Sequence, residues 1–221
     1  MSGKVVYGDA EVVEQEHLDS AATCSLFALA LHLELEQESV HAATTIADFP
    51  KIVTPDRMLP QTLAGLHKIE HANRTQAYRL LWRQSTDFLL QRSSTPPDEP
   101  TNWIINAEIP HTDELASELQ AFCLSPDVRV KRFKVAKDFR KYIHKMIEEL
   151  RLDIDHETER KGSPYTLVCV KNRASYKRRL NEYAEDVRYI GRLLTLVPQG
   201  ETEEAERVKR LEAAKAAFRS K

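Results

Sequence analysis

The sequence is poor in cysteine and has no long uninterrupted hydrophobic run. Its three cysteines, Cys24, Cys123 and Cys169, form no Cys-x-x-Cys pair and leave an odd number, so neither a disulfide framework nor a cysteine zinc site is indicated. A reducing intracellular compartment, nuclear or cytoplasmic, is therefore expected. The longest apolar stretch, residues 21–35, is interrupted by His32 and Glu34 and is too short to span a bilayer, so we expect no membrane partner.

The chain also lacks the common targeting and catalytic signatures. Its first residues do not show the pattern of a secretory signal, and their acidity argues against an Arg-rich transit peptide, unless one has been removed on entry to an organelle. There is no P-loop, no Gly-x-Ser-x-Gly and no His-Glu-x-x-His. We therefore expect a protein that is not an enzyme. A nuclease built on scattered Asp and Glu stays a minor alternative, because such ligands have no fixed spacing.

One pair of residues has the spacing of a metal ligand motif. Glu38-x-x-His41 resembles the Glu-x-x-His pieces of carboxylate metal bundles. That architecture needs two such motifs and two further inward carboxylates. The sequence therefore predicts no metal site and no cofactor.

Charge is distributed unevenly along the 221 residues. Residues 1–111 carry 8 Lys and Arg against 15 Asp and Glu, whereas residues 112–221 carry 24 against 19. Within residues 127–179 the count is 16 basic against 8 acidic, enough to attract a polyanion at close range. A solvated charged surface would give the same counts. The chain is long enough for two units, each with its own core.

The N-terminal part shows helical periodicity. Apolar residues recur at near-helical spacing in residues 12–41, with Asp19 and Ser20 available as caps, and again in residues 63–90. Pro55 and Pro60 are expected in the loop between them. We therefore predict a helical N-terminal region over residues 1–91, followed by a Pro-rich linker over residues 92–101.

The second half mixes the two periodicities. Residues 103–109 are expected to be extended, and a helix is expected from Thr112. Residues 128–135 predict a basic edge strand and residues 137–150 an amphipathic helix. Two strands at residues 153–158 and 165–170 are expected around a turn that contains Gly and Pro. On the buried face of the 137–150 helix we expect Phe139, Ile143, Met146, Ile147 and Leu150.

Arg140 and His144 are the most specific pair in that helix. Residues four apart lie on one helical face, which we expect to be opposite Ile143 and Ile147 and open to solvent. With Lys137 and Lys141 beside them, two such donors can contact neighbouring phosphate groups. A structural role for the pair is the alternative.

The flanking sequence resembles the R-3-H family, named for Arg-x-x-x-His. The residues that carry the resemblance are Arg140, His144, Leu150, Leu152, His156, Gly162, Leu167, Val168 and Lys171. The resemblance covers about 60 residues. It implies a three-stranded antiparallel sheet with two helices on one face, and binding of single-stranded nucleic acid. The expected fold is thus α+β, with an R-3-H-like domain over residues 102–172 and a charged helical tail over residues 173–221.

The turn before the last strand departs from the family pattern. Ser163-Pro164-Tyr165 stands where members commonly carry a second Gly and a basic residue. Tyr165 is expected either to stack on a base or to pack in the fold. Residues 171–179 hold five bases around Tyr176, which suits an extension of the binding surface or a solvated helix. The full set of expected contacts is Arg132, Lys134, Lys137, Arg140, Lys141, His144, Lys161, Tyr165, Lys171 and Arg173.

These patterns predict a binding protein for single-stranded nucleic acid, with RNA ahead of DNA, acting within a ribonucleoprotein or regulatory assembly. A protein partner is expected on the acidic N-terminal half or on the C-terminal helix. The alternative hypothesis is a scaffold or adaptor that keeps the R-3-H-like fold without binding nucleic acid.

Overall fold

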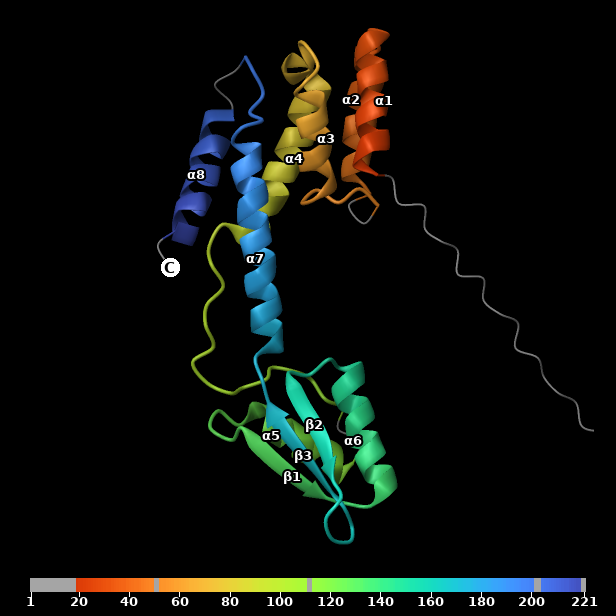
Figure 1. Cartoon of the computed structure of the whole chain (residues 1–221), viewed down its shortest axis with the longest axis vertical. Coiled ribbons are helices and arrows are strands. Elements are labelled where there is room, and N and C mark those ends of the chain that lie inside the picture. Colours follow the sequence, from red (N-terminus) through yellow and green to blue (C-terminus); the bar gives the residue numbers. More distant parts are fainter. Residues whose placement is uncertain (1–18, 50–51, 111–112, 201–203, 220–221) are drawn as a thin grey trace, which may run out of the picture. The chain divides into compact units, whose positions relative to one another are not determined.

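The computed structural model describes residues 19–49, 52–110, 113–200 and 204–219 (Figure 1). The chain forms two compact units. Unit 1 comprises residues 1–95 and 185–221, and unit 2 comprises residues 96–184. The regular elements of the described residues are helices and one three-stranded antiparallel sheet. This confirms the α+β class.

Unit 1 is helical. Its elements are α1 (Ser20–His32), α2 (Glu36–Ala47), α3 (Met58–Leu66), the 3-10 turn η1 (Ala72–Arg74), α4 (Gln76–Ser93), the end of α7 (Ala174–Leu193) and α8 (Ala205–Arg219). The Asp19 carboxylate caps α1 by accepting a hydrogen bond from the Ala22 N–H at 2.6 Å. The described part of the helical pattern predicted over residues 12–41 forms two helices, because the chain turns at Glu34, whose φ is 57°. Residues 12–18 of that prediction lie outside the described residues.

The core of unit 1 forms around two aromatic residues of α4 that carry polar tips. Trp82 and Tyr78 are almost fully buried. The indole Nε1 of Trp82 donates to the Leu193 carbonyl at 3.0 Å, and the Tyr78 hydroxyl donates to the Leu196 carbonyl at 2.9 Å. The bonds join α4 to the last residue of α7 and to the segment that follows α7, and they satisfy two buried donors. Pro60 was predicted in a loop but lies in the first turn of α3, where proline is tolerated.

Unit 2 contains the sheet. Its elements are α5 (Glu114–Leu124), β1 (Val130–Lys134), α6 (Lys137–Glu149), β2 (Ile154–Glu159), β3 (Thr166–Lys171) and the start of α7. The strand order is β1-β3-β2, so β1 is the edge strand that the sequence predicted. Phe133, Leu167 and Cys169 pack with apolar residues of both α5 and α6 in one core. The two helices therefore cover the same face of the sheet.

The structure refines two expectations for unit 2 and contradicts a third. Residues 103–109 are not a strand, although the backbone N–H of Ile105 donates to the Cys123 carbonyl at 2.9 Å. Asp113, rather than Thr112, caps α5. Phe139 and Leu150 were expected in the core, but they are 55% and 37% exposed. Both lie at an end of α6, where a side chain can extend past the sheet.

Candidate nucleic-acid interface

Arg140 is buried, which corrects the prediction that it faces solvent. Its side chain is only 8% exposed. Nη1 donates to the Val135 carbonyl at 2.6 Å and to the Tyr165 carbonyl at 3.3 Å. Arg140 precedes Ile143 by three residues and Ile147 by seven, so all three share the buried face of α6. The guanidinium therefore joins the start of α6 to the turn between β2 and β3.

His144 is half-buried beside a second histidine. Its ring centroid lies 4.5 Å from that of His156, and its Nε2 lies 3.5 Å from the Thr158 hydroxyl. Burial lowers the pKa of His144, and the neighbouring His156 and Arg140 lower it further, against an opposing effect of Glu148. The imidazole is therefore neutral near pH 7. It does not supply the positive charge that a phosphate contact would use.

Lys171 is fully buried, so it is not an exposed phosphate ligand. Its Nζ donates to the Cys123 carbonyl at 3.1 Å and the Ser125 carbonyl at 2.7 Å, and lies 4.7 Å from the centre of the Phe122 ring. These carbonyls belong to the C-terminal end of α5, which carries partial negative charge and lacks helical partners. Lys171 therefore caps α5 from the end of β3.

Two further predicted contacts are already engaged. Arg132 forms an ion pair with Glu159 across the outer face of the sheet. Arg173 pairs with Glu99 at 3.0 Å, and its guanidinium lies 4.9 Å from the centre of the Trp103 ring. Both side chains are only partly available to a ligand.

The remaining predicted residues lie together at one end of unit 2. Lys134 and Glu159 are both paired with Thr166, so the turn that follows Glu159 lies next to the end of β1. Figure 1 shows this turn and the start of α6 at the same end of the sheet. The exposed cations and aromatic rings there are Lys134, Lys137, Phe139, Lys141, Arg160, Lys161 and Tyr165, which we call the basic end. Sequence reasoning missed Phe139 and Arg160.

The cations of the basic end are not neutralised within the described part of the chain. None of its four lysines, nor Arg160, lies within ion-pair distance of a carboxylate there, and Asp138 is the one acidic residue in the first turn of α6. The N-cap residue of α6 is Ala136, which provides no side-chain cap. The positive end of a helix dipole thus adds to the lysine charges.

Tyr165 is positioned by the buried arginine. The Arg140 guanidinium carbon lies 5.3 Å from the centre of the Tyr165 ring, while the same guanidinium binds the Tyr165 carbonyl. The ring remains 41% exposed. Arg140 thus supports an aromatic surface instead of contacting a ligand.

The described residues contain neither a metal-binding cluster nor a membrane-spanning helix. No group of three or more His, Cys, Asp or Glu there is arranged to hold a metal ion. None of the helices described is both long and apolar enough to cross a membrane. No protein-family model matches the chain, and neither a curated protein nor a solved structure matches it.

Proposed function

We propose that this chain binds single-stranded nucleic acid, with RNA ahead of DNA, through the basic end of unit 2. The observation that carries the proposal is the grouping of five exposed, unneutralised cations with two exposed aromatic rings. Proteins that hold single strands combine these two features, since cations follow the phosphates and rings stack on the bases. The R-3-H resemblance around Arg140 and His144 supports the same ligand.

The contacts divide by chemistry. Lys137 and Lys141 are four residues apart on one exposed face of α6, so their ammonium groups suit successive phosphates. Tyr165 and Phe139 offer ring faces to bases. Stacking tolerates any base, so we expect weak sequence preference. No step in this proposal is catalytic, and the protein acts by holding its ligand.

The test is titration of a fluorescent single-stranded RNA, and of DNA of the same sequence, at two salt concentrations. The triple variant Lys134→Gln, Lys137→Gln, Lys141→Gln is expected to bind at least about tenfold more weakly. Its log-log salt slope should be smaller by up to about 2, because each neutralised phosphate contributes about 0.7. Tyr165→Ala should weaken binding about fivefold or more, with the salt slope unchanged.

The matched control is Lys209→Gln, Arg210→Gln, which removes two exposed charges of α8 in unit 1. It should bind RNA as the parent chain does. Equal losses in the control and the triple variant would show that only net charge matters, and undiminished binding by the triple variant would refute the basic end as the contact surface.

A further inference from the structure

Helix α1 of unit 1 carries an exposed stripe of leucines. Leu26, Leu29 and Leu33 are 52%, 56% and 55% exposed. Their spacing of three and then four residues places them on one face, as in the seam by which one helix packs against another. Single exposed leucines are ordinary, but a run of three on one helical face is typical of a contact surface. We call these three residues the leucine stripe.

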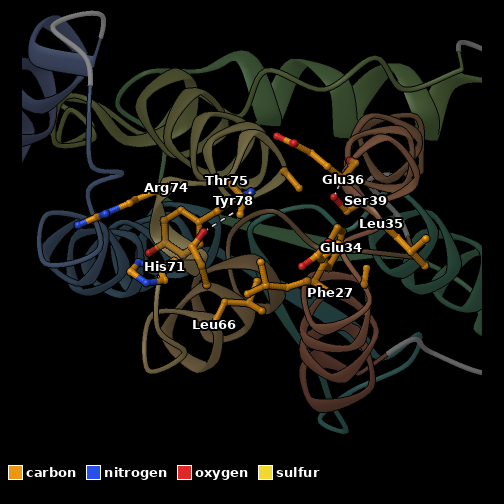
Figure 2. Close-up of a pocket in the computed structure, with 14 residues that line it drawn as sticks. Phe27, Glu34, Leu35, Glu36, Ser39, Leu66, His71, Arg74, Thr75 and Tyr78 are labelled. Atoms are coloured by element: carbon orange, nitrogen blue, oxygen red, sulfur yellow. Dashed lines mark hydrogen bonds between the residues drawn. The ribbon is translucent and has the colours of Figure 1, made fainter.

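A cavity of about 360 Å³ adjoins the leucine stripe. Its apolar lining includes Phe27, Leu31, Leu66 and Tyr78. Figure 2 shows Glu34 and Glu36 on one side of this cavity and Arg74 on the other. Ala30 also lines the cavity, and it lies four residues after Leu26 and three before Leu33, so the lining of the cavity begins beside the stripe on the surface of α1. The cavity can accept one large apolar side chain.

The same surface is acidic. Residues 19–48, which form α1 and α2, contain five Asp and Glu and no Lys or Arg. Glu34, Glu36 and Glu38 are all exposed just beyond the end of the stripe. A ligand for this surface therefore needs an apolar face and positive charge beside it.

We infer that the leucine stripe is a docking surface for a basic amphipathic helix of another protein. The apolar face of that helix would cover the stripe, one large side chain would enter the cavity, and its Lys or Arg residues would meet the three glutamates. A second copy of the stripe fits poorly, because pairing two copies brings only carboxylates together. Residues 1–18 fit poorly for the same reason, since they carry one Lys against four Asp and Glu.

The binding test uses the full chain and a defined probe. The probe is a labelled helical peptide of about 18 residues, with leucines at alternating spacings of three and four and lysines between them. A matched peptide carries glutamate in place of lysine. Fluorescence anisotropy should show the Leu-Lys peptide binding at least about tenfold more tightly than the Leu-Glu peptide. Equal affinities, or no binding of either peptide, would overturn the inference.

Two sets of variants locate the contact. Leu29→Gln, Leu33→Gln should weaken Leu-Lys binding at least about tenfold, because burying one leucine is worth about that factor or more. The control Leu124→Gln, Val128→Gln removes two apolar side chains of similar exposure from unit 2 and should leave binding unchanged. Losses of the same size in both double variants would refute the assignment.

The three glutamates beside the stripe allow a second, independent test of the docking surface. Glu34→Gln, Glu36→Gln, Glu38→Gln leaves the core intact and should weaken Leu-Lys binding severalfold while reducing its dependence on salt. An unchanged salt dependence would count against the inference. Sedimentation of the chain alone should show a monomer. A dimer that Leu29→Gln, Leu33→Gln abolishes would assign the stripe to a second copy and overturn it as well.

Discussion

Both units hold cations away from solvent, Arg92 partly in unit 1 and Lys171 and Arg140 almost completely in unit 2, but the two units compensate them differently. In unit 1, Arg92 binds Asp186 through Nε at 2.9 Å and Asp56 through Nη2 at 2.8 Å. Burial by itself lowers the pKa of Arg92, but the hydrogen bonds and charges of Asp186 and Asp56 outweigh it and raise the pKa overall. In unit 2, Lys171 and Arg140 bind backbone carbonyls. Burial lowers the pKa of Lys171.

The difference shows what a buried positive charge can be used for. A pair of carboxylates compensates the charge of a guanidinium and joins three segments of unit 1. Carbonyl dipoles compensate a charge less completely, but they are available wherever a helix or strand ends. Unit 2 therefore uses Lys171 and Arg140 to tie the ends of its helices and strands together, and its exposed lysines are the cations that stay open to solvent.

The sharpest way to break the comparison is to remove a carboxylate from unit 1. Asp186→Ala should destabilise the chain by about 3 kcal/mol, because it takes from the partly buried Arg92 guanidinium one of its two carboxylate partners. Urea unfolding measures the loss. Removing the exposed pair Arg57 and Glu185, which are 2.8 Å apart, should cost about 1 kcal/mol or less. Similar losses at both pairs would contradict the distinction.

Lys171→Met should have the next largest effect. It keeps the aliphatic length but leaves the Cys123 and Ser125 carbonyls without their donor, so we expect a loss of about 2–3 kcal/mol. Hydrogen exchange should locate the loss at the end of α5. The matched change Lys177→Met, at an exposed position of α7, should leave stability almost unchanged.

Arg140→Lys separates a positioning role from a phosphate contact. A lysine ammonium cannot reproduce the guanidinium geometry, so we expect about 1–2 kcal/mol of lost stability. The affinity of the folded protein for RNA should fall mainly as far as Tyr165 is displaced, and its salt slope should stay unchanged. A reduced salt slope would instead show that Arg140 binds phosphate.

The smallest expected effect is a pH dependence from His144. Because its folded pKa lies below the ordinary 6.5, the unfolded chain binds more protons in the window between those two values. Stability should therefore fall as the pH drops below 6.5. Urea midpoints at pH 7.5 and 5.5 measure the change, and His144→Gln should reduce it. A variant with an undiminished change would assign the effect to another group.

The sequence predicted the elements of unit 2 well, because their apolar periodicity is strong. The helix at residues 137–150 and the strands on either side of Gly162 were confirmed within a residue or two at most ends. The site was harder to predict. Arg140 has the spacing of a core residue relative to Ile143 and Ile147, so the pattern indicated burial. Its charge favoured exposure, and the prediction followed the charge.

Phe139 shows what the pattern could not contain. It lies close to the buried face by helical spacing, yet it is exposed because side chains in a first turn point back past the helix start. The apolar pattern does not show that the sheet ends beside the first turn of α6. The α1 stripe could not be predicted for a related reason. Leu26, Leu29 and Leu33 recur at helical spacing, but sequence alone does not say which face of an apolar helix lacks a neighbour.

The reactivity of the two buried thiols of unit 2, those of Cys123 and Cys169, depends on how often that unit opens. Burial raises the pKa of Cys169 to about 12 and that of Cys123 to about 11, with Cys123 adding to the shift at Cys169 and Lys171 opposing the shift at Cys123. Neither sulfur is accessible, so an alkylating reagent can modify them only in molecules whose core has loosened. The rate at which these thiols are labelled therefore measures how often unit 2 opens. A bound nucleic acid would lower that rate.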